Sequence, residues 1–160
     1  MSLKRRIIVA IIILFVVLGI VLYVFYKRKN IKISNIKRFH FSYSVGYHYE
    51  ASFIYNVDIV DGKYQATIKK EGVTIENAKK VIITKKDVNK IEEILKKYKV
   101  NSWNGFNKSN KYVLDGDSFS LYVTFEDETE IDASGYMMYP KNYNNVQGEL
   151  DKLFNEFYER

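Results

Sequence analysis

The chain begins with one long apolar run, after which apolar and polar residues alternate in shorter segments. Twenty residues, from Ile7 to Tyr26, carry no charge and lie between two clusters of lysine and arginine. Twenty helical residues cover about 30 Å, which is the thickness of the hydrocarbon core of a bilayer. The run exceeds the apolar region of a signal peptide, and no small-residue cleavage site follows it. The pattern therefore predicts an uncleaved transmembrane anchor.

The anchor divides the chain into four predicted parts: a basic tail over residues 1–6, the anchor over 7–26, a juxtamembrane basic stalk over 27–36 and one domain over 37–160. Positive charges counted on both sides of the anchor favour a cytoplasmic domain. A short basic segment before a long apolar run is nevertheless the layout of secretory targeting, and long domains translocate largely regardless of charge. We therefore expect a single-pass, signal-anchored membrane protein with an extracytoplasmic C-terminal domain, and a lipid bilayer as one partner.

The domain contains several segments with the period-two alternation of half-buried strands. Residues 39–45, 51–59 and 63–69 alternate in this way, with a turn over 46–50 between the first two. Asp61-Gly62 separates the last two and is a strong signal for a tight hairpin. A short apolar run at residues 81–83 predicts another strand. Alternation in residues 119–125 and 129–133 predicts a second hairpin.

Two amphipathic helices are expected in the same domain. Thr84 followed by Asp87 predicts a capping box, after which apolar residues from Val88 to Tyr98 recur at spacings of three and four. A second apolar stripe runs from Tyr143 to Phe157, and Gly148 within it predicts close packing because glycine is costly inside a helix. The order of elements predicts an α+β domain with an antiparallel sheet and both helices on one face.

Charge is distributed unevenly along the chain. The formal net charge is +6, but residues 1–30 hold six basic and no acidic residues, which leaves 19 of each sign in residues 31–160. The domain is therefore neutral overall, and nucleic acid is not an expected partner. Within the domain, residues 63–99 are rich in lysine and residues 113–160 are rich in acids. Such runs are usually solvated faces, although they could also give the surface two poles.

The densest block of motifs runs from Val113 to Tyr143. It contains Asp115-Gly116, then Phe119-Ser120-Leu121, and later a glycine at 135 and a proline at 140. This block resembles a family of small uncharacterised bacterial proteins, chiefly from Firmicutes, that are secreted or membrane-anchored. The resemblance covers about 60 residues. It implies a location at the bacterial cell membrane and a final helix after the block, and it implies no activity.

The same block supplies a candidate interaction surface. Aromatic residues and methionine are enriched at protein interfaces, although here they could equally close the edge of the core. The turn residues around Asp115 could launch a strand or contribute polar contacts to a ligand. The candidate residues are Trp103, Phe106, Asp115, Asp117, Tyr136, Met137, Met138 and Tyr139.

Candidate chemistry is sparse. Without cysteine there are no thiol reactions or cysteine metal sites, and only His40 and His48 could serve as imidazole bases. Acids clustered between Asp115 and Asp132 suggest calcium, but the order of an EF-hand loop is absent and alternating acids in a strand share a solvent face. No hydrolase elbow or phosphate-binding loop is present. We therefore expect no cofactor, no metal and no catalytic residue.

These observations predict a membrane-anchored small binding or interaction module of unknown ligand. An alternative is an accessory or regulatory subunit that docks on a membrane complex through its transmembrane helix, with another membrane or cell-envelope protein as partner. A more remote alternative is a hydrolase that uses carboxylates such as Asp115 and Asp117.

Overall fold

The computed structural model describes residues 3–29, 31–46 and 52–160 of the chain. It separates into two compact units, Met1–Ile31 and Lys32–Arg160. The first unit contains the helix α1, Leu3–Lys29. The second contains every strand of the structure and two further helices. The turn predicted over residues 46–50, with His48, lies largely outside the described residues.

The prediction of a transmembrane anchor from Ile7 to Tyr26 is wrong. Among residues 3–29, 31–46 and 52–160, no helix combines the length and the hydropathy that a membrane crossing requires. The membrane, single-pass and signal-anchor interpretations are corrected with it.

The second unit is an α+β domain, as predicted. Its strands are β1 (Ile36–Ser44), β2 (Ser52–Val60), β3 (Lys63–Lys69), β4 (Lys79–Ile83), β5 (Phe106–Ser109), β6 (Ser118–Phe125) and β7 (Glu130–Tyr136). Two longer helices, α2 (Lys85–Lys97) and α3 (Tyr143–Tyr158), accompany the short 3-10 turns η2 (Ile75–Asn77) and η3 (Val100–Trp103). All strands form one sheet in the order β4-β3-β2-β1-β6-β7-β5.

The prediction of an antiparallel sheet needs one correction. Neighbouring strands are antiparallel from β4 to β7, but β5 pairs with β7 in parallel, with Phe106 opposite Ala133, so the sheet is mixed. The four residues of β5, Phe106–Ser109, lie in a largely polar stretch of the sequence. Phe106 is its one apolar residue, so the segment has no alternation that would mark it as a strand. Its pairing with β7 decides its conformation.

The tight hairpin predicted at Asp61-Gly62 is confirmed. Strands β2 and β3 pair in an antiparallel register that ends with Val60 opposite Lys63. Asp61 and Gly62 both adopt positive φ angles, 50° and 73°. This is the conformation that a two-residue hairpin requires, and aspartate and glycine tolerate it better than most residues.

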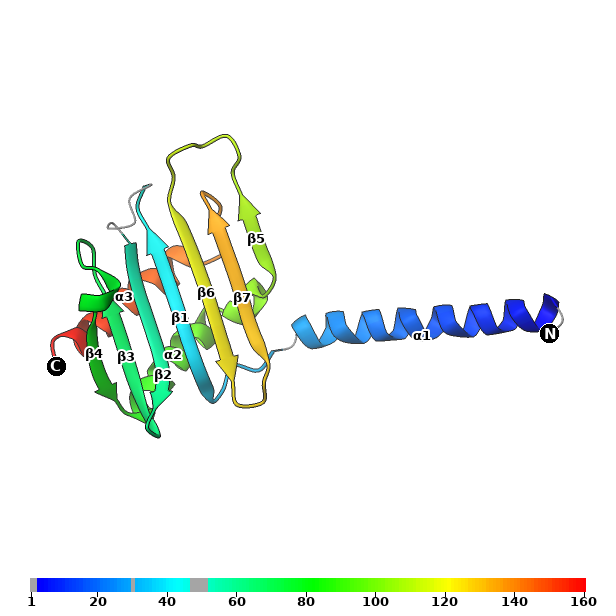
Figure 1. Cartoon of the computed structure of the whole chain (residues 1–160), viewed down its shortest axis with the longest axis horizontal. Helices are drawn as coiled ribbons and strands as arrows, with labels where there is room; N and C mark the ends of the chain where they lie inside the picture. The colour runs from blue at the N-terminus through cyan, green and yellow to red at the C-terminus, as the bar shows by residue number, and fades with distance from the viewer. Residues whose placement is uncertain (1–2, 30, 47–51) are drawn as a thin grey trace. The chain divides into compact units, whose positions relative to one another are not determined.

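Both helices α2 and α3 cover the same face of the sheet, which confirms the predicted layering (Figure 1). The capping box at the start of α2 is also confirmed, because the Asp87 amide donates to Thr84 and the Asp87 carboxylate accepts from the Thr84 amide. The close packing expected at Gly148 is wrong. A Cβ atom at that position would meet nothing within 4 Å, so this glycine does not serve a tight contact.

The core lies between the sheet and the two helices. Its aromatic centre joins β1 and β2 to α3: Phe154 stacks on Phe39 and on Tyr55, with ring centroids 5.9 and 4.5 Å apart. In β1, β6 and β7, the alternate residues that face the helices are almost fully buried. The domain begins slightly before the predicted boundary at residue 37, because Ile33 and Ile36 are buried and the Ile36 amide donates to the buried Glu92 of α2.

Candidate interaction surfaces

A loop at one end of the sheet exposes large apolar side chains. This loop, residues 110–117, connects β5 to β6 and rises above the strands in Figure 1. Tyr112 is 97% exposed and Leu114 is 92% exposed. Burying such side chains is worth about 1.5–3 kcal/mol each, and the described part of the chain leaves both uncovered. A loop tip of this kind is a candidate contact surface.

The base of the loop is fixed on both sides. At its start, the Asn110 amide donates to the Tyr136 carbonyl over 2.9 Å. At its end, the Met137 amide donates to the Asp117 carbonyl, also over 2.9 Å, and the Asp117 amide donates to the sulfur of Met137. The Asp117 carboxylate accepts from the Gly46 amide, which joins the loop to the end of β1. These bonds hold the loop base in place and lower the entropy cost of presenting the tip to a partner.

Further exposed apolar residues lie at the same end of the sheet as this loop. Among residues 32–46 and 52–160, the large apolar side chains that are exposed fall into two groups at opposite ends of the sheet. The smaller group contains Ile59, Val60 and Ile82. We call the larger group the loop-end surface, and it consists of Val45, Tyr112, Leu114, Met138 and Tyr139.

The predicted interaction residues only partly coincide with that surface. Trp103 is buried, with 1% of its area exposed, and its indole N–H donates to the Lys141 carbonyl over 3.0 Å. Its ring lies edge-on to Phe119 in the core. Phe106 is half-buried against the same Phe119 ring. Tyr139 and Met138 are both 39% exposed, so these two predicted residues belong to the loop-end surface.

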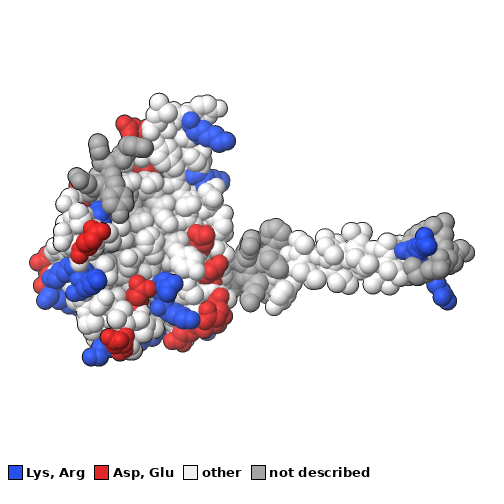
Figure 2. Space-filling view, viewed as in Figure 1, with Lys and Arg blue, Asp and Glu red and all other residues white. Residues whose placement is uncertain are grey.

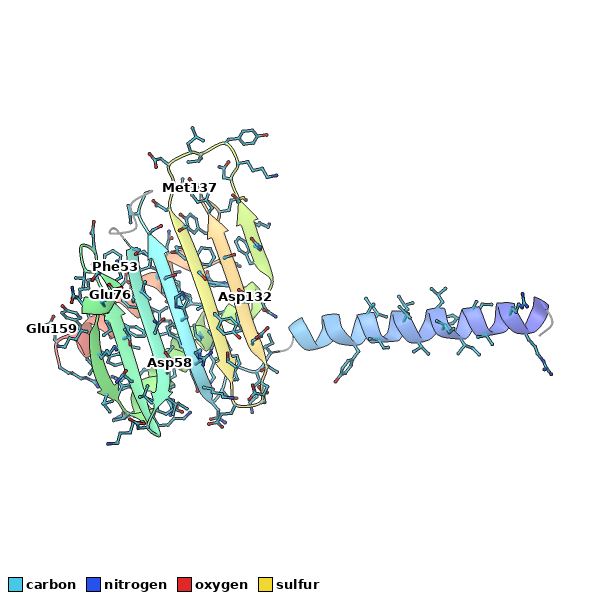
Figure 3. The ribbon with its side chains drawn as sticks, in the orientation of Figure 1. Phe53, Asp58, Glu76, Asp132, Met137 and Glu159 are labelled. Atoms are coloured by element: carbon cyan, nitrogen blue, oxygen red, sulfur yellow. The ribbon has the colours of Figure 1, made fainter. Side chains whose placement is uncertain are left out.

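The remaining predicted residues lie at the base of the loop. Asp115 is exposed, whereas Asp117, Tyr136 and Met137 are half-buried beside one another. A Cβ atom on Gly116 would lie 2.3 Å from Met137 Cγ, which shows how closely the loop backbone approaches this side chain. Met137, labelled in Figure 3, has a φ of 52°. Apart from Asp115, these residues hold the base of the loop in place. The tip of the loop carries Tyr112 and Leu114, which were not among the predicted interaction residues.

The acids considered for calcium are engaged separately. Asp127 accepts from Thr129 within the β6–β7 turn, and Glu128 pairs with Lys37 over 2.7 Å. Glu130 accepts from the hydroxyl of Tyr122. Within residues 3–29, 31–46 and 52–160, no three histidine, aspartate or glutamate side chains converge as a metal site would require.

Sequence analysis also missed a carboxylate that is partly buried beneath the sheet. Asp151 of α3 accepts hydrogen bonds from the hydroxyls of Tyr43 and Tyr55 over 2.9 and 2.8 Å. Burial raises the pKa of Asp151, while the two tyrosine donors partly lower it. Burial raises the pKa values of Tyr43 and Tyr55 far above their ordinary value, and the negative charge of the Asp151 carboxylate raises them further. The sequence does contain a signal for a polar group at the edge of the core. Gln147 and Asp151 follow Tyr143 at intervals of four residues, beside the apolar stripe of α3.

The face of the sheet opposite α2 and α3 is not covered by any other element of the second unit, as described over residues 32–46 and 52–160 (Figure 1). Figure 2 views this face: charged side chains gather towards its margins, and its middle is formed by other residues. Asp58 of β2 and Asp132 of β7, labelled in Figure 3, belong to this face. Asp58 is paired with Arg38 over 3.0 Å. We call this the open face.

A hydrogen-bonded trio lies in the middle of the open face. Nδ1 of His40 lies 2.6 Å from Oδ1 of Asn56, and Nε2 lies 3.2 Å from Oγ of Ser42. With its proton on Nδ1, His40 would donate to Asn56 and accept from Ser42, which resembles the arrangement that activates a nucleophile. Strand β1 is paired on both sides, however, so its backbone N–H groups are engaged in the sheet ladder. The trio therefore lacks a backbone oxyanion hole, and the arrangement suits hydrogen bonding to a ligand better than acyl transfer.

Comparison with known proteins adds no assignment, because no protein-family model and no curated protein matches the chain. The resemblance carried by Asp115-Gly116, Phe119-Ser120-Leu121, Gly135 and Pro140 therefore stays a prediction.

Proposed function

We propose that the α+β domain is a binding module that takes a protein partner on the loop-end surface. The observation that carries this proposal is the nearly complete exposure of Tyr112 and Leu114 on a loop whose base is fixed by hydrogen bonds. Contiguous exposed apolar residues mark interaction sites in soluble domains. Tyrosine and methionine, which form much of the surface, are enriched where proteins meet.

The proposed function is binding without catalysis. The carboxylates considered for hydrolysis, Asp115 and Asp117, differ in role: the first is exposed and the second accepts from the Gly46 amide. A general acid and a general base need environments that push their pKa values apart and a place for substrate between them. The hydrogen bonds of Asp117 instead position the loop, which supports a binding role for this end of the domain.

Site-specific cross-linking tests the proposal. A photoreactive amino acid is placed at Tyr112 in the full chain, and a matched variant carries it at Ile59, which is 49% exposed at the opposite end of the sheet. We expect one discrete protein adduct from position 112 and none from position 59. The Leu114→Ser substitution should lower the yield at position 112 at least tenfold, because it removes a neighbouring apolar contact.

Two results would overturn the proposal. One is equal cross-linking from both positions, which would mean that exposure alone determines the reaction. The other is an adduct with lipid or no adduct at all in cells that express the protein. Melting temperatures of the cross-linker variants, measured by circular dichroism, must match the unmodified protein so that partner loss is not confused with unfolding.

A further inference from the structure

The sequence contains a single Asn-Gly pair, Asn104-Gly105, and it stands directly before β5. In a flexible chain this pair is chemically unstable, because glycine lets its own backbone nitrogen approach the asparagine side chain. The Gly105 nitrogen gives its proton to hydroxide and attacks Cγ of Asn104, and the bond from Cγ to the side-chain nitrogen breaks so that ammonia leaves. Water then opens the five-membered imide at one of its two carbonyls, which yields aspartate or isoaspartate.

The folded domain holds both reacting groups of this pair on one residue of β7. The Asp132 amide donates to Oδ1 of Asn104 over 3.0 Å, and the Gly105 amide donates to the Asp132 carbonyl over 2.8 Å. The attacking nitrogen and the side-chain amide that it would attack are therefore engaged by the two backbone groups of Asp132. Because β7 lies between β6 and β5, these two groups point away from β6 and leave the β6–β7 ladder intact. We call this arrangement of Asn104, Gly105 and Asp132 the Asp132 clamp.

The backbone conformation at Asn104 is a second barrier to the reaction. Its φ and ψ angles are −55° and 124°, and Gly105 follows with a φ of 79°, as the central residues of a type II turn have. Closing the imide ring brings the Gly105 nitrogen nearly in line with Cβ of Asn104, which an L-residue reaches only at a negative ψ. The turn needs glycine for its positive φ, so the residue that shapes the turn also makes the pair reactive once the turn is lost.

The clamp depends on β5, which few other contacts secure. This strand has four residues, lies at the edge of the sheet and pairs with β7 alone in the described chain (Figure 1). Phe106 is its one half-buried residue, with its ring centroid 6.1 Å from that of Phe119, and the other three residues are exposed. Segments with few buried contacts open locally at a lower free energy than the whole domain. Because Trp103 is buried directly before the pair, such an opening frees Asn104 and Gly105 without unfolding the core.

We propose that Asn104 is a self-modification site controlled by β5: the asparagine persists while the Asp132 clamp is closed and converts to isoaspartate or aspartate when β5 detaches from β7. The two products differ in their effect on the strand. Aspartate keeps a side-chain oxygen that accepts from the Asp132 amide. Isoaspartate adds one carbon to the main chain before Gly105 and removes the side-chain carbonyl from the clamp, so β5 no longer fits against β7. The modification does not depend on whether the loop-end surface binds a protein.

Peptide mass spectrometry of the full chain, incubated in mildly alkaline buffer, tests the proposal. We expect Asn104 to convert at least tenfold more slowly in the folded protein than in the same protein unfolded in urea. Phe106→Ser removes the ring contact that holds β5, so it should accelerate conversion in the folded protein at least threefold. Ile59→Ser is the matched control, because Ile59 is a 49% exposed apolar residue on β2, and its rate should equal that of the unmodified protein.

Hydrogen exchange of the purified isoaspartate form tests the structural consequence. The amides of Gly105 and Asn110, which donate to β7 carbonyls, should exchange at least tenfold faster than in the unmodified protein. Asn104→Asp supplies the aspartate product and should keep both amides protected.

Three results would overturn the proposal. The first is equal conversion of Asn104 in the folded and the unfolded chain, a comparison that needs no variant and decides the matter even if Phe106→Ser does not fold. The second is a folded Phe106→Ser protein that converts no faster than Ile59→Ser. The third is an isoaspartate form in which Gly105 and Asn110 remain as protected as in the unmodified protein.

Discussion

The guanidinium group of Arg160 donates two hydrogen bonds, each 2.9 Å long, to the two carboxylate oxygens of Asp87. Asp87 is buried, with 5% of its area exposed, and it also accepts from the amide and the hydroxyl of Thr84. One carboxylate thus caps the start of α2 and binds the segment that follows α3. This pair fixes the start of α2 to the end of α3, where the Arg160 guanidinium also lies over the Phe157 ring, 4.8 Å from its centroid.

Replacing Arg160 should destabilise the domain measurably. Arg160→Ala leaves a buried carboxylate with fewer partners, and we expect a loss of about 1–2 kcal/mol in the free energy of unfolding. The partial exposure of the arginine side chain, 40%, keeps the expected loss at the lower end of the range for such pairs. Arg160→Lys retains the charge but not the bidentate hydrogen bonding, so it should lower the free energy of unfolding by less than Arg160→Ala. Urea denaturation of the three proteins checks this, and identical midpoints would contradict it.

Acid should weaken the domain through the same carboxylate. The hydrogen bonds from Arg160, and to a lesser extent those from Thr84, hold the pKa of Asp87 well below its ordinary value. The unfolded chain takes up this proton near pH 3.9, before the folded protein does, so the stabilisation is present above that pH and is lost as the pH falls below it. Asp87→Asn should therefore show a shallower decline in unfolding free energy between pH 5 and pH 2. Parallel curves for Asp87→Asn and the unmodified protein would show that other groups control acid unfolding.

Periodicity predicted the parts of the fold in which local pattern and tertiary packing agree. Strands β1 to β3, β6 and β7 and helices α2 and α3 all appear close to their expected positions, because each has one apolar face against a shared core. His40 alternates with the buried Phe39 and Phe41 and lies, half-buried, on the opposite face of the sheet. Alternation in β1 thus separates the covered face of the sheet from the open face.

The misses come from interactions between residues distant in sequence. Strand β5 has one apolar residue and exists because its backbone pairs with β7. Trp103 could not be assigned from sequence either to the core or to a surface, since its partner Lys141 is 38 residues away. Asp151 looked like a solvated helix residue until β1 and β2 brought two tyrosine hydroxyls to it. The apolar pattern of residues 7–26 predicted a membrane segment, whereas no helix in the described part of the chain meets the length and hydropathy of one.

Two glycines should respond oppositely to alanine. A Cβ atom on Gly135 of β7 would lie 2.1 Å from the Met138 carbonyl oxygen and 2.6 Å from the Phe119 ring. We expect Gly135→Ala to cost about 2–3 kcal/mol, because neither the backbone nor the buried ring can move freely. Gly148 lies inside α3 with open space around it, so Gly148→Ala should stabilise the domain by about 0.5–1 kcal/mol. Thermal unfolding followed by circular dichroism distinguishes them, and destabilisation by Gly148→Ala would contradict the helix geometry.

Alkaline pH should destabilise the domain through Tyr55. Burial, together with the Asp151 carboxylate, keeps the pKa of Tyr55 far above the value of about 10 that the unfolded chain has. Above pH 10 the unfolded chain therefore loses this proton while the folded protein retains it, and stability falls by about 1.4 kcal/mol per pH unit for one such group. In Tyr55→Phe, the loss between pH 10 and pH 11 should be smaller by about 1 kcal/mol. At pH 7 the same substitution should cost about 1 kcal/mol, because it removes one hydrogen bond to Asp151.

Tyr112→Phe is the control for this experiment, because folding leaves the Tyr112 side chain 97% exposed. Its pH profile should match that of the unmodified protein. Absorbance of tyrosinate near 295 nm provides an independent readout: part of the increase should appear only when the domain unfolds, and that part should shrink in Tyr55→Phe. If all tyrosines ionised together below pH 11 in the folded protein, the hydroxyl of Tyr55 would be open to solvent. In that case Asp151 would not join α3 to the sheet through buried hydrogen bonds.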